Sequence, residues 1–348
     1  MPFRGIKAHD RPVLAEHEES MLWVGALSFE ERCVASLERL VAAGHPPALA
    51  LLLEYPTDVR PVAQDRERRR RNRERIDTAC RGVSGLRVTF VEVDPYSYRA
   101  GQRAVADALA GLGASHVVLD VSCLTKIHAI ALAAPSVFAA SLPWQIAYSM
   151  PETYGHLESS AGTGPGWRDV LVLPIGDSAD VANETHARGI ILAGHEGDRL
   201  VIALAETEPA GGVIITTNTE RRPDLRKESE RRNRKVTQLL VGRGDERWSI
   251  EDIALKDPAA LSRAVETEIN KALAEAAPVL LYPFGPKPFV ALGAMQLAAT
   301  PDLQGWFVYP IAVSYDVDYS YGVGNTVWYA PEPPSGYAQE SLPLERDI

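Results

Sequence analysis

The chain has 348 residues, of which 46% are hydrophobic and 24% are charged, a composition typical of a globular protein. A length of about twice an ordinary domain predicts two domains, each able to bury its own core. The net charge of −10 argues against a general nucleic-acid coat protein, and three cysteines without paired-ligand spacing argue against a disulfide framework or a zinc ribbon.

The sequence also predicts where the protein works. No apolar stretch approaches the ~20 residues that cross a bilayer, and the N-terminus has scattered charges without an apolar core of the kind found in signal peptides. The expected location is therefore the cytoplasm, which is reducing, and no contact with a membrane is expected.

In the first half of the chain, short apolar runs alternate with helical patterns. Strands are predicted at residues 22–26, 48–55, 86–93, 116–121 and 144–149. Helices are predicted between them at residues 30–43, 66–80, 99–112 and 125–139.

The second half repeats this alternation. Its strands are predicted at residues 189–192, 212–216, 248–253, 278–282 and 306–310. Continuous apolar strands separated by helices indicate a parallel sheet covered on both faces. The predicted fold class is α/β, with two pseudo-repeated Rossmann-like domains, each a mainly parallel sheet flanked by helices.

The domain boundaries follow from these elements. Residues 1–155 are predicted to form the first Rossmann-like domain and residues 188–330 the second. Residues 156–187 would form a linker region with a glycine-rich break at 162–166, and residues 331–348 a proline-containing tail.

An internal repeat supports this division. The sequence RRNR at residues 70–73 recurs at 231–234, and Lys126 has a counterpart in Lys287, both at a separation of 161 residues (231 − 70 and 287 − 126). Two distant landmarks at one separation indicate a duplication. The surrounding arginine-rich stretch either forms a solvated helix face or binds a compact anion.

The turn after the strand at 116–121 is the first candidate site, because ligands of open parallel sheets bind beyond the carboxyl ends of the strands. Asp120 ends the strand, Ser122 and Thr125 offer hydroxyl groups, and Lys126 adds a positive charge in the first turn of the next helix. This set suits a phosphate group. The hydroxyls could equally serve as an ordinary helix N-cap.

The corresponding turn in the second half contains Gly285 and Lys287. It keeps the lysine but has no hydroxyl, and Pro286 and Pro288 remove two backbone donors. Gly285 could permit a close approach of the backbone to a ligand. The two halves are therefore expected to differ in their chemistry.

The end of the first strand is the second candidate. Ser28, Glu31 and Arg32 follow this strand, and a weaker match in the second half contains Asp198 and Arg199. Ser28 and Glu31 have the spacing of a capping box. Arg32 could bind a phosphate with two hydrogen bonds, or could pair with Glu31 or Asp120.

The run LDVSCLTK at residues 119–126, followed by an alanine-rich helix, resembles the strand–turn–helix motif of the CARF family, the CRISPR-associated Rossmann-fold sensors. Two such units in one chain also resemble the SAVED sensors of anti-phage signalling systems. The resemblance implies that cyclic oligoadenylate binds across the interface of two such domains. It further implies that Ser122, Thr125 and Lys126 contact phosphate or ribose and that Lys287 is their partner from the other half.

Other reactive side chains have plainer interpretations. His128 could be a general base but is more simply a packed histidine, and nothing in the sequence provides a base to activate Cys123. Tyr315, Asp316, Asp318, Tyr319 and Tyr321 could line a pocket or form a surface hairpin. No metal motif is present, and neither a metal nor a cofactor is expected.

Three functions agree with these observations. The first is a sensor or regulatory subunit that binds a cyclic or short oligonucleotide between its halves and passes the signal to a protein effector partner. The second is a phosphodiesterase of the ring nuclease type, which needs little beyond positioning and charge stabilisation. The third is a scaffold subunit of a larger complex, with the arginine-rich helices as its contact surfaces.

Overall fold

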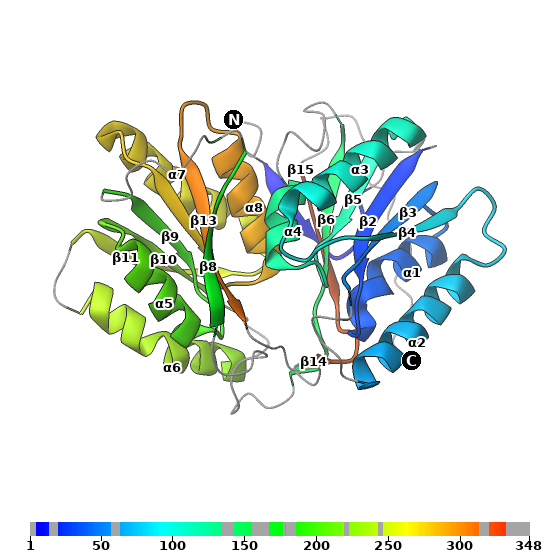
Figure 1. The fold of residues 1–348 in the computed structure, drawn as a ribbon, viewed down its shortest axis with the longest axis horizontal. Coiled ribbons are helices and arrows are strands. Elements are labelled where there is room, and N and C mark those ends of the chain that lie inside the picture. The colour runs from blue at the N-terminus through cyan, green and yellow to red at the C-terminus, as the bar shows by residue number, and fades with distance from the viewer. Residues whose placement is uncertain are drawn as a thin grey trace.

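The computed structural model describes residues 5–13, 20–56, 63–133, 142–154, 167–176, 178, 186–218, 223–242, 246–312 and 320–331. Two β-sheets stand side by side, and helices cover their outer faces and fill the space between them (Figure 1). The fold is α/β with mainly parallel sheets, which confirms the predicted fold class.

The first sheet has the strand order β1-β15-β6-β5-β2-β3-β4. Its strands are β1 (Ile6–His9), β2 (Met21–Leu27), β3 (Leu49–Glu54), β4 (Arg87–Glu92), β5 (His116–Asp120), β6 (Trp144–Ser149) and β15 (Thr326–Pro331). Strands β2 to β6 pair in parallel, whereas β15 pairs antiparallel with both β6 and β1. The central strands are buried throughout and largely apolar, as expected for a sheet covered on both faces.

The helices of the first half are close to those predicted from the sequence. They are α2 (Ala63–Cys80), α3 (Tyr98–Leu112) and α4 (Lys126–Ala133). The helix predicted at residues 30–43 begins instead with a 3-10 turn, η1 (Glu31–Val34), which leads into α1 (Ala35–Ala42).

The second sheet has the strand order β11-β10-β9-β12-β13-β8. Its strands are β8 (Trp167–Pro174), β9 (Arg188–Leu192), β10 (Gly211–Asn218), β11 (Trp248–Ala254), β12 (Val279–Pro283) and β13 (Gly305–Ala312). Its helices are α5 (Gly197–Thr207), α6 (Pro223–Leu240), α7 (Pro258–Glu275) and α8 (Lys287–Ala298). All pairs are parallel except β13 with β8, so the order matches that of the first sheet from β4 to β15.

Two strands have partners that the sequence-based division does not suggest. Strand β8 lies in the range predicted as a linker but pairs with β13 of the second sheet. Strand β15 lies within the range of the second domain, apart from its last residue, but pairs with β6 of the first sheet. The division into two domains therefore stays a prediction, and these pairings would move its boundaries. The glycine-rich break and residues 332–348 lie outside the described residues.

A continuous hydrophobic core joins the two halves. One cluster of buried side chains contains residues of both sheets and of the helices between them, including Leu119, Ile130, Leu281 and Leu292. Helix α4 packs against α8 in this layer. Separate clusters under α1 and α2, and under α5 and α6, complete the outer layers. Within the described ranges, no helix is both long and apolar enough to cross a membrane.

Candidate ligand-binding site between the halves

A cavity of about 670 Å³ lies at the carboxyl ends of the parallel strands of both sheets. Residues that follow β2 and β5 line it from the first half, and residues that follow β9 and β12 line it from the second. The place is where open parallel sheets bind ligands, and the volume lies within the range of small-molecule sites. A small hairpin of β7 (Thr153–Tyr154) and β14 (Ser320–Tyr321) lies beside it.

The cavity brings together six of the eleven site residues predicted from the sequence. These are Ser28, Arg32, Thr125, Lys126, Gly285 and Lys287. The other five predicted residues do not line it: Glu31 and Asp198 are exposed, whereas Asp120, Ser122 and Arg199 are buried behind the cavity wall.

Asp120 and Ser122 hold the shape of the first-half turn. The Asp120 carboxylate accepts hydrogen bonds from the Ser36 hydroxyl and, at 2.8 Å, from the backbone N–H of Ser122. The Ser122 hydroxyl accepts a bond of 2.8 Å from the backbone N–H of Ser149. Burial raises the pKa of Asp120. Both side chains are thus engaged within the protein.

Lys126 extends from the first half to a buried ion-pair cluster of the second. Its Nζ atom lies 2.9 Å from Oε1 of Glu196, and Arg199 pairs with the other oxygen of the same carboxylate. Arg199 also donates to the carbonyl of Pro310, and its guanidinium lies 4.8 Å from the centre of the Tyr309 ring. Lys126 is therefore held in place by a carboxylate from the opposite half.

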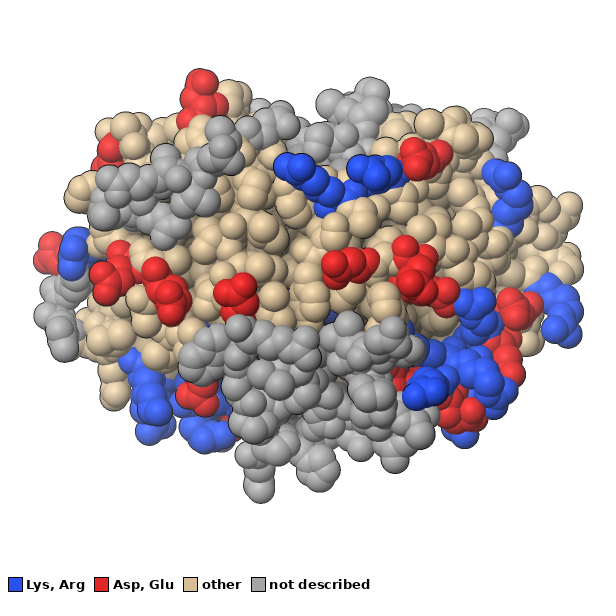
Figure 2. All heavy atoms as spheres, in the orientation of Figure 1, with Lys and Arg blue, Asp and Glu red and all other residues tan. Residues whose placement is uncertain are grey.

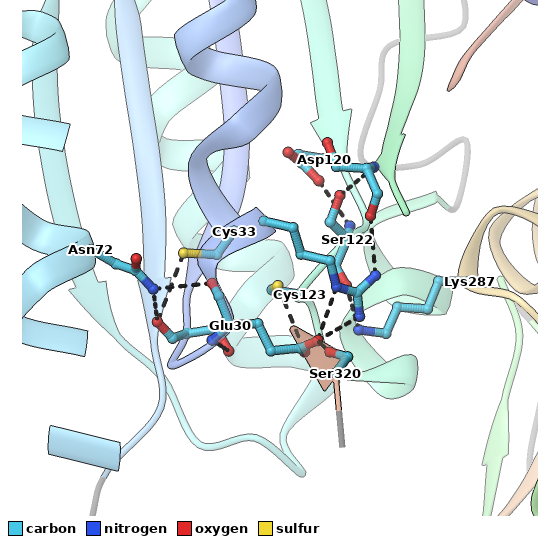
Figure 3. A network of polar contacts seen from close by, with 11 residues as sticks. Glu30, Cys33, Asn72, Asp120, Ser122, Cys123, Lys287 and Ser320 are labelled. Atoms are coloured by element: carbon cyan, nitrogen blue, oxygen red, sulfur yellow. Dashed lines mark hydrogen bonds and ion pairs between the residues drawn. The ribbon is translucent and has the colours of Figure 1, made fainter. Parts of the chain in front are cut away.

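Lys287 makes the reciprocal connection, from the second half to the first (Figure 3). Its Nζ atom donates to the carbonyl of Ser122 at 2.8 Å, beside the carboxylate of Glu30. Arg32 pairs with Glu30 through two nitrogens, at 2.9 and 2.7 Å, and donates to the carbonyl of Ser149 at 3.1 Å. Of the protein partners considered for Arg32, neither Glu31 nor Asp120 is used.

The capping box predicted from Ser28 and Glu31 is wrong. The residue before η1 is Glu30, whose side chain makes no capping bond. The Ser28 hydroxyl instead accepts a bond of 3.3 Å from the backbone N–H of Glu30. This shapes the loop that carries the Glu30 carboxylate to Arg32.

The two clusters correspond at the separation found in the sequence. Tyr148 and Tyr309 lie beside the two arginines, and each arginine donates to the carbonyl of the next residue, Ser149 or Pro310. Both pairs of positions are 161 residues apart (309 − 148 and 310 − 149). Each half therefore has a buried Glu–Arg pair at a strand end and receives a lysine from the other half.

The repeated RRNR motif has a structural role in both halves. The Asn72 amide donates to the carbonyls of Ser28 and Glu30 at 2.8 and 3.0 Å, and the Asn233 amide donates to the carbonyl of Gly194 at 2.7 Å. Each buried asparagine thus ties its helix to the loop that carries the cluster's glutamate.

The arginines around these asparagines are balanced by carboxylates. Arg70 and Arg71 both pair with Glu67 on α2, and Glu228 serves the same purpose on α6. Figure 2 shows basic and acidic side chains interleaved where α2 lies. This favours the solvated helix face over an anion-binding surface.

The charges in the cavity depend on one another. Burial acts to raise the pKa of Glu30, but Arg32 and Lys287 hold it below its usual value. Glu196 behaves in the same way because of Arg199 and Lys126. Burial and the nearby Arg32 lower the pKa of Lys287 to about 8. At neutral pH both carboxylates are ionised and most Lys287 side chains are protonated.

The candidate catalytic side chains are packed. His128 is fully buried, its ring nitrogens bond to Tyr55, Thr125 and Ser97, and burial lowers its pKa to about 4. Burial raises the pKa of Cys123 well above its usual value, which disfavours the nucleophilic thiolate. In the part of the chain that is described, no group of three or more His, Cys, Asp or Glu side chains could hold a metal ion.

Several lining residues were not predicted from the sequence. Two of the lining carboxylates, Glu30 and Glu196, were missed, although each lies four residues after the predicted first strand of its half. Aromatic side chains from both halves were also missed, namely Tyr55, Tyr96, Tyr148, Tyr154, His195, Phe284 and Tyr309. Tyr321 is 42% exposed, and the other four residues of its tyrosine-rich stretch lie outside the described residues.

Comparisons with known proteins assign no family to this chain. No family model matches the sequence, and no curated protein is significantly similar to it. A DNA nuclease of type III CRISPR defence, activated by cyclic oligoadenylate, aligns with 83% of this chain and 65% of its own at 10% identity and a TM-score of 0.49.

Two further solved structures show weaker similarity. Can2 from Sulfobacillus thermosulfidooxidans, in complex with cyclic tetra-adenylate, aligns with 37% of this chain and 31% of its own at 24% identity and a TM-score of 0.25. A short-chain dehydrogenase/reductase of Serratia marcescens aligns with 82% and 92% at 12% identity and a TM-score of 0.25. The chain thus spans about a third of Can2 and less than two thirds of the nuclease.

Proposed function

We propose that the chain binds a cyclic or short oligonucleotide in the cavity between its halves and acts as a sensor or regulatory subunit, in anti-phage defence. One observation carries the proposal. Lys126 and Lys287 come from equivalent positions of the two halves, and both extend across the cavity to the opposite half. A ligand with several phosphates along a ring or chain matches this pair of opposed cations.

The internal partners of the lysines support a binding role. Glu196 accepts a hydrogen bond from Lys126, and the Ser122 carbonyl accepts one from Lys287, so each buried charge has a partner within the protein. A phosphate oxygen could replace either partner without leaving a lysine unpaired. The carboxylates would then disfavour weakly bound anions and set a threshold for ligand charge.

The apolar part of the cavity supports a nucleotide rather than inorganic phosphate. Phe284 and Tyr309 lie near the Lys126 ammonium, with ring centres at 5.6 and 6.0 Å, and Tyr148 lies near Arg32. Aromatic rings beside cations provide stacking surfaces for bases next to contacts for phosphates. Cyclic oligoadenylate, which the CARF resemblance implies, is the first compound to test.

Thermal unfolding with a panel of ligands tests the proposal. Cyclic rings of two, three, four and six adenylates, cyclic di-GMP, linear AMP and inorganic phosphate are added to the full chain, and each nucleotide is then recovered by chromatography. A free concentration of 100 Kd stabilises the folded state by about 2.7 kcal/mol, which is visible as a higher Tm. We expect stabilisation by a cyclic oligonucleotide that is recovered intact.

Matched lysine variants locate the binding. Lys126→Met should abolish the stabilisation, whereas Lys235→Met, at an exposed position of α6 outside the cavity, should preserve it. Recovery of a cleaved ring would replace the sensor by a phosphodiesterase. Stabilisation by no member of the panel, or equal loss in both variants, would contradict the proposal.

A further inference from the structure

The two walls of the cavity differ in the hydrogen bonds that they can offer. The first-half wall consists of residues that follow β2, β3 and β4, with Phe29, Tyr55 and Arg69 among them. The second-half wall consists of residues around β9, β10 and β11, with His195 and Thr217 among them. Strands β3 and β10 hold the same place in their sheets, as do β2 and β9, so the two walls are unlike versions of one arrangement.

The polar atoms of the first-half wall are engaged within the protein. The Tyr55 hydroxyl accepts a bond from the backbone N–H of Thr125 at 3.2 Å and bonds with Nδ1 of His128 at 3.0 Å. Arg69 pairs with Asp65 at 2.8 Å and donates to the carbonyl of Tyr55 at 2.9 Å. This wall therefore offers ring surface more than hydrogen-bonding groups.

The second-half wall has the opposite character. Nδ1 of His195 and Oγ1 of Thr217 are both buried, and neither has a hydrogen-bond partner among the described residues. A buried polar atom without a partner destabilises the folded state, so such atoms are rare unless they have a role. The two residues that carry these atoms both line this one wall.

The surroundings of His195 suit an uncharged partner. Burial and the nearby Arg232 lower its pKa to about 4, so the ring is neutral at pH 7 and offers one donor and one acceptor nitrogen. The Tyr154 ring stacks on it, with centres 6.0 Å apart and planes 14° from parallel. A flat, uncharged group with a hydrogen-bonding edge fits this environment better than a phosphate does.

We propose that the second-half wall is a nucleobase subsite in which His195 and Thr217 read the hydrogen-bonding edge of one base, whereas the first-half wall holds another base by stacking alone. The inference rests on the proposed function and deepens it. A pseudo-symmetric cavity of this kind specifies one base of its ligand and tolerates changes in the other.

Rings of mixed base composition test this asymmetry on the unaltered protein. Affinity is measured by calorimetry for cyclic di-AMP, cyclic di-GMP and cyclic AMP–GMP. It is also measured for rings of four that contain four adenines, one adenine and three guanines, or four guanines. A ring of two with one correct base should bind only about twofold more weakly than the uniform ring of two correct bases, because only one of its orientations fits. A ring of four with one correct base should bind about fourfold more weakly than the uniform ring of four, for the same reason. The other uniform ring should bind at least tenfold more weakly, as for the loss of a paired base edge.

Three variants assign the reading to one wall. Thr217→Val and His195→Phe should each weaken the preferred uniform ring by about tenfold and reduce the preference between adenine and guanine. Tyr55→Phe, the comparison in the first-half wall, keeps the ring surface and should leave the preference between adenine and guanine unchanged.

The possible results are distinguishable. If affinity falls with every incorrect base that is added to the ring, the inference is wrong. It is also wrong if Thr217→Val and His195→Phe leave the base preference unchanged. In both cases Lys126→Met would still abolish binding, so the proposed function would stand. An altered base preference in Tyr55→Phe would overturn the asymmetry. Binding of none of the rings would overturn the proposed function on which the inference rests.

Discussion

Lys126 of the first half and Glu196 of the second form an ion pair of 2.9 Å, with side chains only 11% and 15% exposed. Because Arg199 pairs with the other oxygen of Glu196, this carboxylate has two cationic partners. The pair connects the two halves beside the cavity and occupies the lysine that the proposed ligand would need.

The first prediction concerns this pair. Lys126→Met and Glu196→Gln should each lower the free energy of unfolding by about 1–3 kcal/mol, because each leaves a buried partner with fewer bonds. The double variant should cost less than the sum of the two by about 1 kcal/mol. Urea unfolding of the four proteins measures this coupling, and strictly additive losses would show that the pair contributes nothing.

The same two variants should change ligand affinity in opposite directions. Glu196→Gln removes the charge that competes for Lys126 and should strengthen binding of the oligonucleotide that stabilises the protein, whereas Lys126→Met should abolish it. Calorimetric titration gives both values. Weaker binding in Glu196→Gln would mean that the carboxylate contacts the ligand instead of competing with it.

The second prediction is a pH dependence at Lys287, whose pKa is about 8. Affinity for the oligonucleotide should fall as the pH rises from 7 to 9, because the ammonium group loses its proton in this window. Lys287→Arg, which keeps its charge, should remove most of this fall. A fall of equal size in Lys287→Arg would assign it to another group.

The contribution of Lys287 to the stability of the folded protein should change with pH in the opposite direction to its contribution to affinity. The pKa of Lys287 is lower in the folded protein than its ordinary value of 10.5, so between about pH 8 and 10.5 the unfolded chain binds more protons. The contribution of Lys287 to stability therefore rises with pH in this window. Lys287→Met should remove that contribution in urea unfolding at pH 8, 9 and 10.

The third prediction distinguishes the asparagines of the RRNR motifs from their arginines. Asn72→Ala and Asn233→Ala should each lower the free energy of unfolding by about 1–3 kcal/mol, because buried carbonyls lose their donor. Arg71→Ala, at a side chain 68% exposed, should stay within about 0.5 kcal/mol. If Arg71→Ala lowers the free energy of unfolding strongly and the asparagine variants do not, the asparagines do not have the structural role inferred here, and the scaffold hypothesis for the motif would be favoured.

The fourth prediction concerns the glycine loop beside His195. A Cβ atom at Gly194 would overlap the carbonyl oxygen of Phe284, so Gly194→Ala should destabilise the protein by about 1–3 kcal/mol. Gly111→Ala, in helix α3 with open space around it, should stabilise it by about 0.5–1 kcal/mol. Thermal unfolding of both variants checks the opposite signs.

The sequence predicted the parallel strands well because most of them are continuous apolar runs. Strands β1 and β15 were missed because their partners are distant in sequence, and β8 because its pairing with β13 cannot be read from its own residues. A strand at the edge of a sheet is defined by what it pairs with more than by its own pattern.

The residues that line the cavity were predicted only in part. Lys126 and Lys287 were found because they recur at one separation and follow strand ends. Glu30 and Glu196 were missed because a phosphate site is sought by its cations, whereas buried cations need carboxylate partners. The correct partner of Arg32 depends on the loop shape set by Ser28 and Asn72, which local sequence patterns do not encode.

The pairing of β15 with β6 also affects the order in which the protein can mature on the ribosome. Domains usually fold from the N-terminus as they are synthesised. Here residues 21–149 leave the ribosome early, but their sheet keeps an unpaired strand at β6 until residues 326–331 are made. The second sheet has no such delay, because β8 precedes the strands that it joins. The half that is synthesised first is therefore the half that is completed last, and its open edge is the part that a nascent chain would need to protect from aggregation.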